Sequence, residues 1–283
     1  MTLRFNLYAA GVLAPGITSL AGLLELQRTG CAPPAAAASD LPSPEALPAN
    51  ERRRASQVVR LTMACAAQAL KASPFPADAL RLVFASDEGT GEVCQQMLEA
   101  LTTTRLVSPL LFHNSVHNAP SGYLSIGYQN RQSATSVSLG AESFASGLLC
   151  AASEACTSGQ PVLLLAYDPP VTGPLHELLP LKHATATAWI IASGNAPASG
   201  HAPLAAFSLS LHSAAPADAA AGVVAQVELA LPAWLPAAWA ANSSALGLVA
   251  LALLGDTQDH PACEMRLGAQ LLRLERSSET AAC

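Results

Sequence analysis

Residues 134–144 read Ala134-Thr135-Ser136-Val137-Ser138-Leu139-Gly140-Ala141-Glu142-Ser143-Phe144. The first five of these residues form a short run typical of a buried strand. Leu139 and Gly140 indicate a sharp turn. Apolar and small residues then recur at helical spacing as far as Cys156, namely at Ala145, Leu148, Leu149 and Ala152. The stretch therefore predicts a strand, a sharp turn and a helix that packs on a core.

Similar units lie on both sides of this stretch. Upstream, Arg81–Ser86 reads as a strand, and Gly89-Thr90-Gly91 leads from it into a helix marked by Val93, Met97, Leu98 and Leu101. Downstream, Pro161–Tyr167 and Thr185–Ser193 are continuous apolar runs of the kind that is buried on both faces of a sheet. Alternating strands and helices predict a layered α/β fold.

The N-terminal part extends the same pattern. Leu3–Leu13 predicts a strand, followed by a turn at Pro15-Gly16 and a short helix to Leu26. The proline-rich residues 31–50 predict a surface loop. An amphipathic helix is expected from Asn50 to about Leu70. The charge run Glu51-Arg52-Arg53-Arg54 at its start fits a solvated face or a contact with an acidic partner.

The pattern weakens beyond Gly194. Strands are expected at Ala205–His212 and Val223–Ala230, a helix at Asn242–Leu254, and a frayed tail at Glu275–Cys283. We divide the chain into a main region, residues 1–195, and a C-terminal extension, residues 196–283, that completes the same domain.

Composition excludes several classes of function. Only 12% of residues are charged and the net charge is −6, so the basic surface that binds nucleic acid is missing. The longest apolar run, Ala245–Leu254, is too short to insert across a membrane, and the N-terminus is a poor signal peptide. We therefore expect a cytoplasmic protein. Seven scattered cysteines without a C-x-x-C pair predict reduced thiols and no metal site.

A family resemblance rests on the segment that precedes the quoted stretch, Val107-Ser108-Pro109-Leu110-Leu111-Phe112-His113-Asn114-Ser115-Val116-His117-Asn118-Ala119-Pro120-Ser121-Gly122. It resembles the segment before the nucleophile strand of β-ketoacyl synthases, and Gly89-Thr90-Gly91 is similar to a turn of that family. The order of features agrees over residues 3–195. The sequence looks most like the short, chain-length-factor-like subunits of aryl-polyene clusters. This resemblance implies a thiolase-like layered fold, mainly the N-terminal thiolase half with a reduced C-terminal part.

The resemblance also shows what is missing. The cysteine nucleophile of the family falls on Leu139, Gly140 or Ala141, and none of these side chains can form an acyl-enzyme. The two histidine loops that assist decarboxylation in the family are absent as well. Glu142 would oppose a thiolate beside it, whereas it suits the start of a helix as a capping charge.

The resemblance implies a non-catalytic chain length factor that pairs with an active ketosynthase, shapes its acyl tunnel, and meets acyl carrier protein through the complex, without a cofactor of its own. The strand at Ala134–Ser138 and residues 112–128 are expected to form the contact. Leu139, Phe144 and Tyr123 are expected to face the tunnel. The predicted interface and tunnel residues are Phe112, His113, Asn114, His117, Asn118, Tyr123, Ser138, Leu139 and Phe144.

Three alternatives remain open. The chain could be an acyltransferase or condensing enzyme that uses Ser138 or Ser143, or a cysteine such as Cys150, although G-x-S-x-G is not matched around either serine. It could also be a structural homodimer. His113 and His117 have the spacing of two metal ligands on one helix face, but their asparagine-rich surroundings favour a loop.

Overall fold

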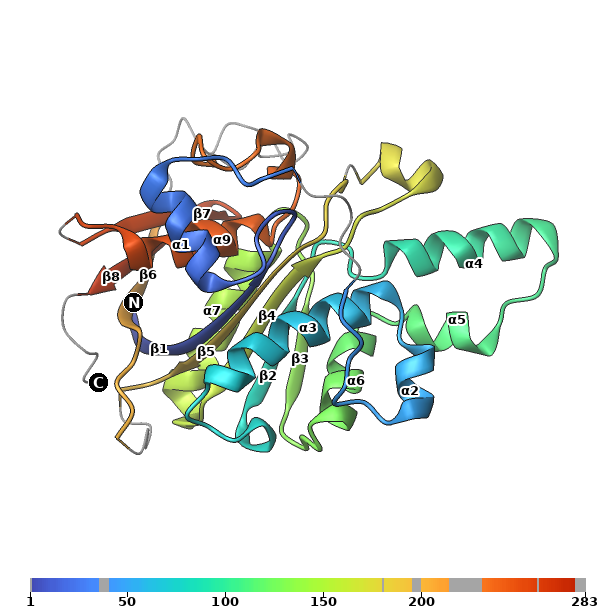
Figure 1. Cartoon of the computed structure of the whole chain (residues 1–283), viewed down its shortest axis with the longest axis horizontal. Coiled ribbons are helices and arrows are strands. Elements are labelled where there is room, and N and C mark those ends of the chain that lie inside the picture. The colour runs from blue at the N-terminus through green and yellow to red at the C-terminus, as the bar shows by residue number, and fades with distance from the viewer. Residues whose placement is uncertain are drawn as a thin grey trace.

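The computed structural model describes residues 2–35, 41–179, 181–194, 200–213, 231–258 and 260–277. In these parts of the chain, eight strands form a single sheet in the order β3-β2-β4-β5-β1-β6-β8-β7 (Figure 1). The strands are β1 (Thr2–Leu13), β2 (Arg81–Ala85), β3 (Ala134–Val137), β4 (Val162–Asp168), β5 (Thr185–Ala192), β6 (Ala205–Ser213), β7 (Ala262–Leu267) and β8 (Gln270–Ser277).

The sheet is mixed, and its parallel part holds the predicted units. β2 pairs in parallel with both β3 and β4, whereas the other neighbouring strands are antiparallel. Parallel neighbours need a long crossover. Three helices supply it between β2 and β3, namely α4 (Gly91–Thr103), α5 (Pro109–Asn114) and α6 (Ala119–Gly127), and α7 (Ser143–Ser158) supplies it between β3 and β4.

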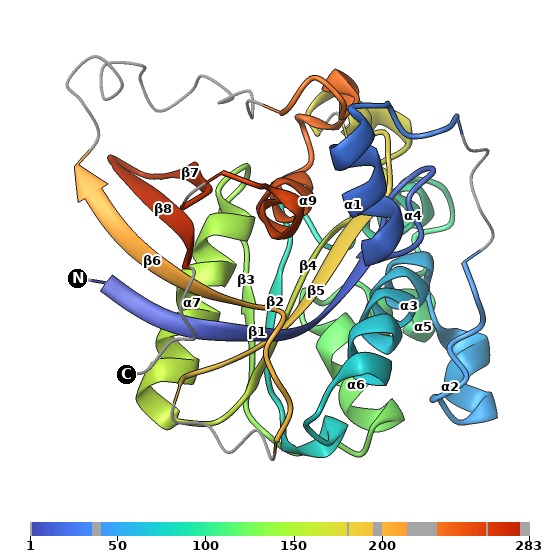
Figure 2. The same ribbon diagram turned by 60° about the vertical axis from the view of Figure 1, so that its left-hand side comes forward.

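Helices cover both faces of the sheet (Figure 2). One face packs against α3 (Gln57–Ala72) and α6, and the other against α7 and α9 (Ala245–Ala252), with α1 (Leu20–Thr29) beside α9. Alternate residues of β2 enter the two cores: Leu82 and Phe84 face α3, while Val83 and Ala85 face α7. The predicted layered α/β fold is therefore present, with its strands buried on both faces.

Helix α7 lies unusually close to β2. A β-carbon added to Gly147 would lie 2.5 Å from the β-carbon of Ala85, which is inside van der Waals contact. The missing side chain at this position lets α7 pack directly on the strand. This close packing fixes the position of the turn at Leu139 and Gly140, which precedes α7, relative to the sheet.

The remaining helical elements are short. Helix α2 (Ala49–Arg54) precedes α3, and 3₁₀ turns occur at η1 (Ala77–Ala79), η2 (Gly173–Glu177), η3 (Ala237–Trp239) and η4 (Leu253–Gly255). Figure 1 shows α4 and α5 extending away from the sheet. Within the described residues, no helix has the length and apolar character needed to cross a membrane.

Two helix and strand predictions are corrected by the structure. The helix expected after Asn50 is two helices, because Ala55 and Ser56 are extended. The Asn114 side chain donates a hydrogen bond to the Arg54 carbonyl (3.1 Å) and so satisfies the end of α2. The strand at Ala134–Ser138 is not buried: β3 is an edge strand, and its side chains are partly exposed.

The C-terminal predictions also need correction. Glu275–Ser277 are the end of β8 rather than a tail, and Arg276 donates hydrogen bonds to the carbonyls of Leu254 and Asp256, both at 2.7 Å. The helix expected from Asn242 begins at Ala245. Val223–Ala230 and residues 278–283 lie outside the described residues.

Candidate functional site

The elbow joins the end of β3 at Val137 to the start of α7 at Ser143. Gly140 has φ of +57°, a backbone conformation that glycine adopts without strain. Leu139 and Ala141 form a bridge across it, and the Leu139 side chain is 54% exposed. The predicted sharp turn is therefore present. Leu139, Gly140 and Ala141, on which the nucleophile of the resembled family was expected to fall, carry no group able to attack a thioester.

The two serines of the elbow hold the turn together. The buried Ser143 hydroxyl donates to the Gly140 carbonyl (2.7 Å) and accepts from the Leu139 N–H (2.9 Å). The Ser138 hydroxyl donates to the Asp87 carbonyl (2.6 Å). Each hydroxyl proton is already bonded to a backbone oxygen, whereas a nucleophilic serine needs its proton directed at a base. This geometry counts against either serine as the nucleophile.

Cys150 is no better placed for catalysis. It lies within α7, half-buried, two turns beyond the elbow. Burial, and then the nearby Glu154, raise the pKa of its thiol. Because the thiolate is the reactive form, these surroundings oppose nucleophilic attack by Cys150.

The carboxylate that faces the elbow is Asp87, which follows β2. A β-carbon on Gly140 would lie 3.8 Å from Asp87 Oδ1. Burial, and then the neighbouring Asp168, raise the pKa of Asp87 to about 6. A second anion at the elbow would face this charge, so the site disfavours a thiolate. Sequence reasoning missed Asp87, although β2 and β3 are parallel neighbours whose carboxyl ends must lie side by side.

Glu142 does not cap the helix that follows it, although the sequence suggested that it would. Its carboxylate accepts a hydrogen bond from the Gly268 N–H (2.8 Å) and does not cap the free amides of α7. Gly268 lies in the turn between β7 and β8. The side chain therefore ties the elbow to the C-terminal hairpin, a contact between residues 126 positions apart.

Asp168, at the end of β4, is a fully buried carboxylate that connects three segments. It accepts hydrogen bonds from the Ser86 hydroxyl (3.3 Å) and the Asp87 N–H (2.9 Å). It also accepts from the Ser243 hydroxyl (3.1 Å) and the Ser244 N–H (2.7 Å). The carboxyl ends of β2 and β4 are thereby fastened to the turn before α9. Sequence reasoning missed this residue too.

Three polar side chains gather around the Gly89-Thr90-Gly91 turn. A β-carbon on Gly89 would lie 3.1 Å from the His117 ring and 3.7 Å from the Tyr167 hydroxyl. Burial lowers the pKa of His117, and burial first of all raises the pKa of Glu88 to about 7. His117 Nε2, Glu88 Oε2 and the Tyr167 hydroxyl are buried without a hydrogen-bond partner among the described residues. Three buried polar atoms without a partner among the described residues therefore adjoin this turn.

The predicted loop at His113 is wrong, because His113 belongs to α5. Its ring packs edge-on against Tyr123, with 5.7 Å between ring centroids and 76° between the planes. His117 lies beyond the end of α5, so the two histidines do not share a helix. In the described part of the chain, no group of three or more His, Cys, Asp or Glu side chains is placed to hold a metal ion.

We expect Glu88→Gln to raise the melting temperature more at about pH 7.5 than at about pH 5. The pKa of Glu88 is about 7 in the fold against 4.5 for an ordinary glutamate. Between these values the folded state binds more protons than the unfolded state, so Glu88 costs stability as the pH rises. Scanning calorimetry at both pH values measures the effect. The exposed Glu177→Gln is the charge control, and equal shifts in the two variants would contradict the prediction.

The comparisons with known proteins place this geometry in a family. Residues 27–236, more than half of the chain, match the family model for the N-terminal domain of β-ketoacyl synthases. The chain belongs to the β-ketoacyl synthase family. A search of curated proteins found no significant match.

Solved structures of this family share its fold. A ketosynthase in complex with its chain length factor from Xenorhabdus doucetiae is 21% identical, with a TM-score of 0.67, and the match covers 97% of this chain and 100% of that one. The ishigamide ketosynthase/chain length factor is 15% identical, covers 96% and 99%, and has a TM-score of 0.70. A type II polyketide synthase acyl-carrier protein complex with its ketosynthase is 12% identical, covers 98% and 100%, and has a TM-score of 0.75. The predicted thiolase-like fold is confirmed.

The interface residues predicted for this β-ketoacyl synthase relative divide by burial. Phe112, His113, Asn118, Ser138 and Leu139 are exposed, and His117 is half-buried. The buried ones are Asn114, Tyr123 and Phe144.

These three side chains lie in the interior of this chain. Phe144 packs against Trp189 in the core beneath α7, with 6.0 Å between the two ring centroids. Tyr123 belongs to the core under α3, and the Asn114 amide bonds the carbonyls of Arg54 and Leu110.

Proposed function

We propose that this chain is a non-catalytic, chain-length-factor-like subunit that pairs with an active ketosynthase in fatty-acid or polyketide-type synthesis of the aryl-polyene kind. It shapes the acyl tunnel of its partner in the cytoplasm and meets acyl carrier protein through the complex. One observation carries the proposal. The strand, elbow and helix of a β-ketoacyl synthase are complete, yet no nucleophile stands at the elbow and its serines are bonded into the turn.

The free edge of β3 supports a partner chain. The carbonyls of Ser133 and Val137 accept hydrogen bonds from β2, at 2.9 and 3.2 Å. Because alternate residues of a strand bond to the same side, the backbone groups of Ala134 and Ser136 point away from β2. Within the described residues, β3 has no neighbour on that side. Such an edge is a template for another strand.

An exposed apolar surface lies on α4, α5 and the segments that adjoin them. Its side chains are each at least 42% exposed: Leu98, Leu101, Leu106, Leu110, Phe112 and Val116. Large apolar side chains gathered on one projecting element favour a protein partner over water. Figure 1 shows this helix pair extending beyond the sheet, where a second subunit can reach it. The surface and the β3 edge together support a ketosynthase partner.

Acyl transfer separates this proposal from an active enzyme. We expect acyl carrier protein loaded with a radiolabelled acyl group to label the ketosynthase of the complex and leave this chain unlabelled, because its elbow has no free nucleophile. Denaturing electrophoresis of the complex measures the label on each chain. The active-enzyme alternative would be established instead if the wild-type chain carried the label and one of the variants Ser138→Ala, Ser143→Ala or Cys150→Ala did not.

A further inference from the structure

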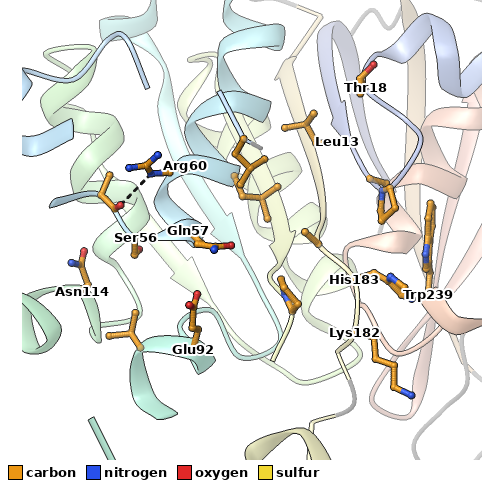
Figure 3. A pocket seen from close by; sticks show the side chains of 18 of the residues that line it. Leu13, Thr18, Ser56, Gln57, Arg60, Glu92, Asn114, Lys182, His183 and Trp239 are labelled. Carbon is orange, nitrogen blue, oxygen red and sulfur yellow. Dashed lines mark hydrogen bonds between the residues drawn. The ribbon is translucent and has the colours of Figure 1, made fainter. Parts of the chain in front are cut away.

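A cavity of about 1050 Å³ lies apart from the elbow. Its walls come from the end of β1, the starts of α3 and α4, α5, the segment before β5 and the segment around η3. No residue of the elbow, from Ser138 to Glu142, lines it. Figure 3 shows Arg60, Gln57 and Glu92 on one side, with His183 and Trp239 opposite. The size suits a small-molecule site, for which about 300–1,000 Å³ is usual.

Much of this cavity is apolar. The larger apolar side chains that line it are Leu13, Leu41, Leu61, Val93, Leu110, Leu111 and Trp239. Pro33, Pro34 and Pro170 add rigid apolar surface. Such a lining favours an aliphatic chain, because burying it removes apolar area from water.

The charged groups of the cavity are mostly cationic. Arg53, Arg54, Arg60 and Lys182 contribute four positive charges against one negative charge from Glu92, which leaves a formal charge of +3. A ligand with an anionic group offsets this charge. The cavity therefore combines an apolar wall with an excess of positive charge.

Arg60 and Lys182 are both available to a ligand. Neither forms an ion pair among the described residues, and Arg60 makes one weak bond, from Nε to the Ala55 carbonyl at 3.4 Å. Arg53, which bonds the Asn50 side chain, is also outside any ion pair of the described residues. Arg54, by contrast, pairs with Glu51 at 3.5 Å.

The start of α3 also fits an anion beside Arg60. The 16-residue helix α3 begins at this wall, and the hydroxyl of its capping residue Ser56 bonds none of the described residues. The start of a helix carries a partial positive charge. The polar wall beside Arg60 therefore combines a partial positive charge with a hydroxyl that has no protein partner among the described residues.

We propose that this cavity binds an amphipathic anion, with its aliphatic chain along the apolar wall and its carboxylate or phosphate group beside Arg60 and the start of α3. The site goes beyond the proposed function, because it lies away from the elbow and needs no ketosynthase. Charge and shape together select the ligand: an uncharged chain leaves the cations unpaired, and a bare anion leaves the apolar wall hydrated.

Calorimetric titration of the purified chain tests this site. Decanoate and decyl phosphate, below their micelle concentrations, are the two probes, and they distinguish a carboxylate from a phosphate head. We expect one saturable site for at least one of them. Decanol and inorganic phosphate, which each lack half of the chemistry, are expected to bind at least about tenfold more weakly.

Variants decide whether binding occurs in this cavity. Arg60→Met is expected to weaken binding by about tenfold or more, as the loss of one charge-assisted bond implies. Lys71→Met removes one charge from the exposed far end of the same helix and is the matched control. Lys182→Met changes an exposed side chain and tests the opposite wall without risk to folding. Failure of both probes to saturate, decanol binding as tightly as decanoate, or wild-type affinity in both Arg60→Met and Lys182→Met would overturn the proposal.

Discussion

Ser136→Pro is expected to abolish co-elution of this chain with the ketosynthase proposed as its partner, in size exclusion after co-expression. The Ser136 N–H points to the open side of β3, so a proline there removes a donor that only a partner strand can use. The bonds between β3 and β2 use Ser133 and Val137 and stay intact. We expect the affinity to fall by at least about a hundredfold, because the ring of proline also blocks close approach of the partner strand.

Two controls distinguish lost pairing from lost folding. Ser136→Ala keeps the N–H and is expected to pair as the wild type does. Ser136→Pro itself is expected to keep the circular dichroism of the wild type, since proline is tolerated on the open side of an edge strand. Normal pairing in a folded Ser136→Pro would contradict an interface at β3. A wild-type chain that elutes only as a homodimer and never with the ketosynthase would contradict the proposed function itself.

Asp168→Ala is expected to lower the free energy of unfolding by about 3–5 kcal/mol. The substitution leaves four donors without an acceptor: the donors from Ser86, Ser243 and Ser244 are buried, and the Asp87 N–H is partly buried. Unpaired buried donors keep their full desolvation cost. The same change also releases the turn before α9 from the ends of β2 and β4. Urea denaturation followed by circular dichroism measures the loss.

Matched variants test whether this effect belongs to the network. Asp168→Asn keeps one oxygen acceptor and is expected to lose less than Asp168→Ala. Asp78→Ala removes an exposed carboxylate in η1 and is expected to change stability by less than about 0.5 kcal/mol. Similar losses in Asp168→Ala and Asp78→Ala would show that the network contributes little.

Local patterns were sufficient for much of the fold. The strands β2, β4 and β5 and the helix α7 were predicted because each is a continuous apolar run or a run with helical spacing. The hairpin of β7 and β8 was not predicted, although apolar and charged residues alternate on both sides of a two-residue turn at Gly268-Ala269. Gly268 has φ of +60°, as such a turn requires.

The place of β3 in the sheet could not be predicted in the same way. Its small residues read as a buried strand, but burial of a strand depends on which neighbours pair with it. That pairing is set by the crossover through α4, α5 and α6, which brings β3 to the edge beside β2. The small side chains of β3 are compatible with a buried strand and equally with an edge strand that a partner covers.

The residues alone determined that no cysteine stands at Leu139, Gly140 or Ala141, where the resemblance places the nucleophile of the family. Only the tertiary structure decided what surrounds the elbow. Asp87 faces it from the end of β2, while Asp168 binds Ser244, which lies 76 residues further along the chain. Parallel strands bring their carboxyl ends to one edge of the sheet, and contacts of that kind leave no periodic signal in the sequence.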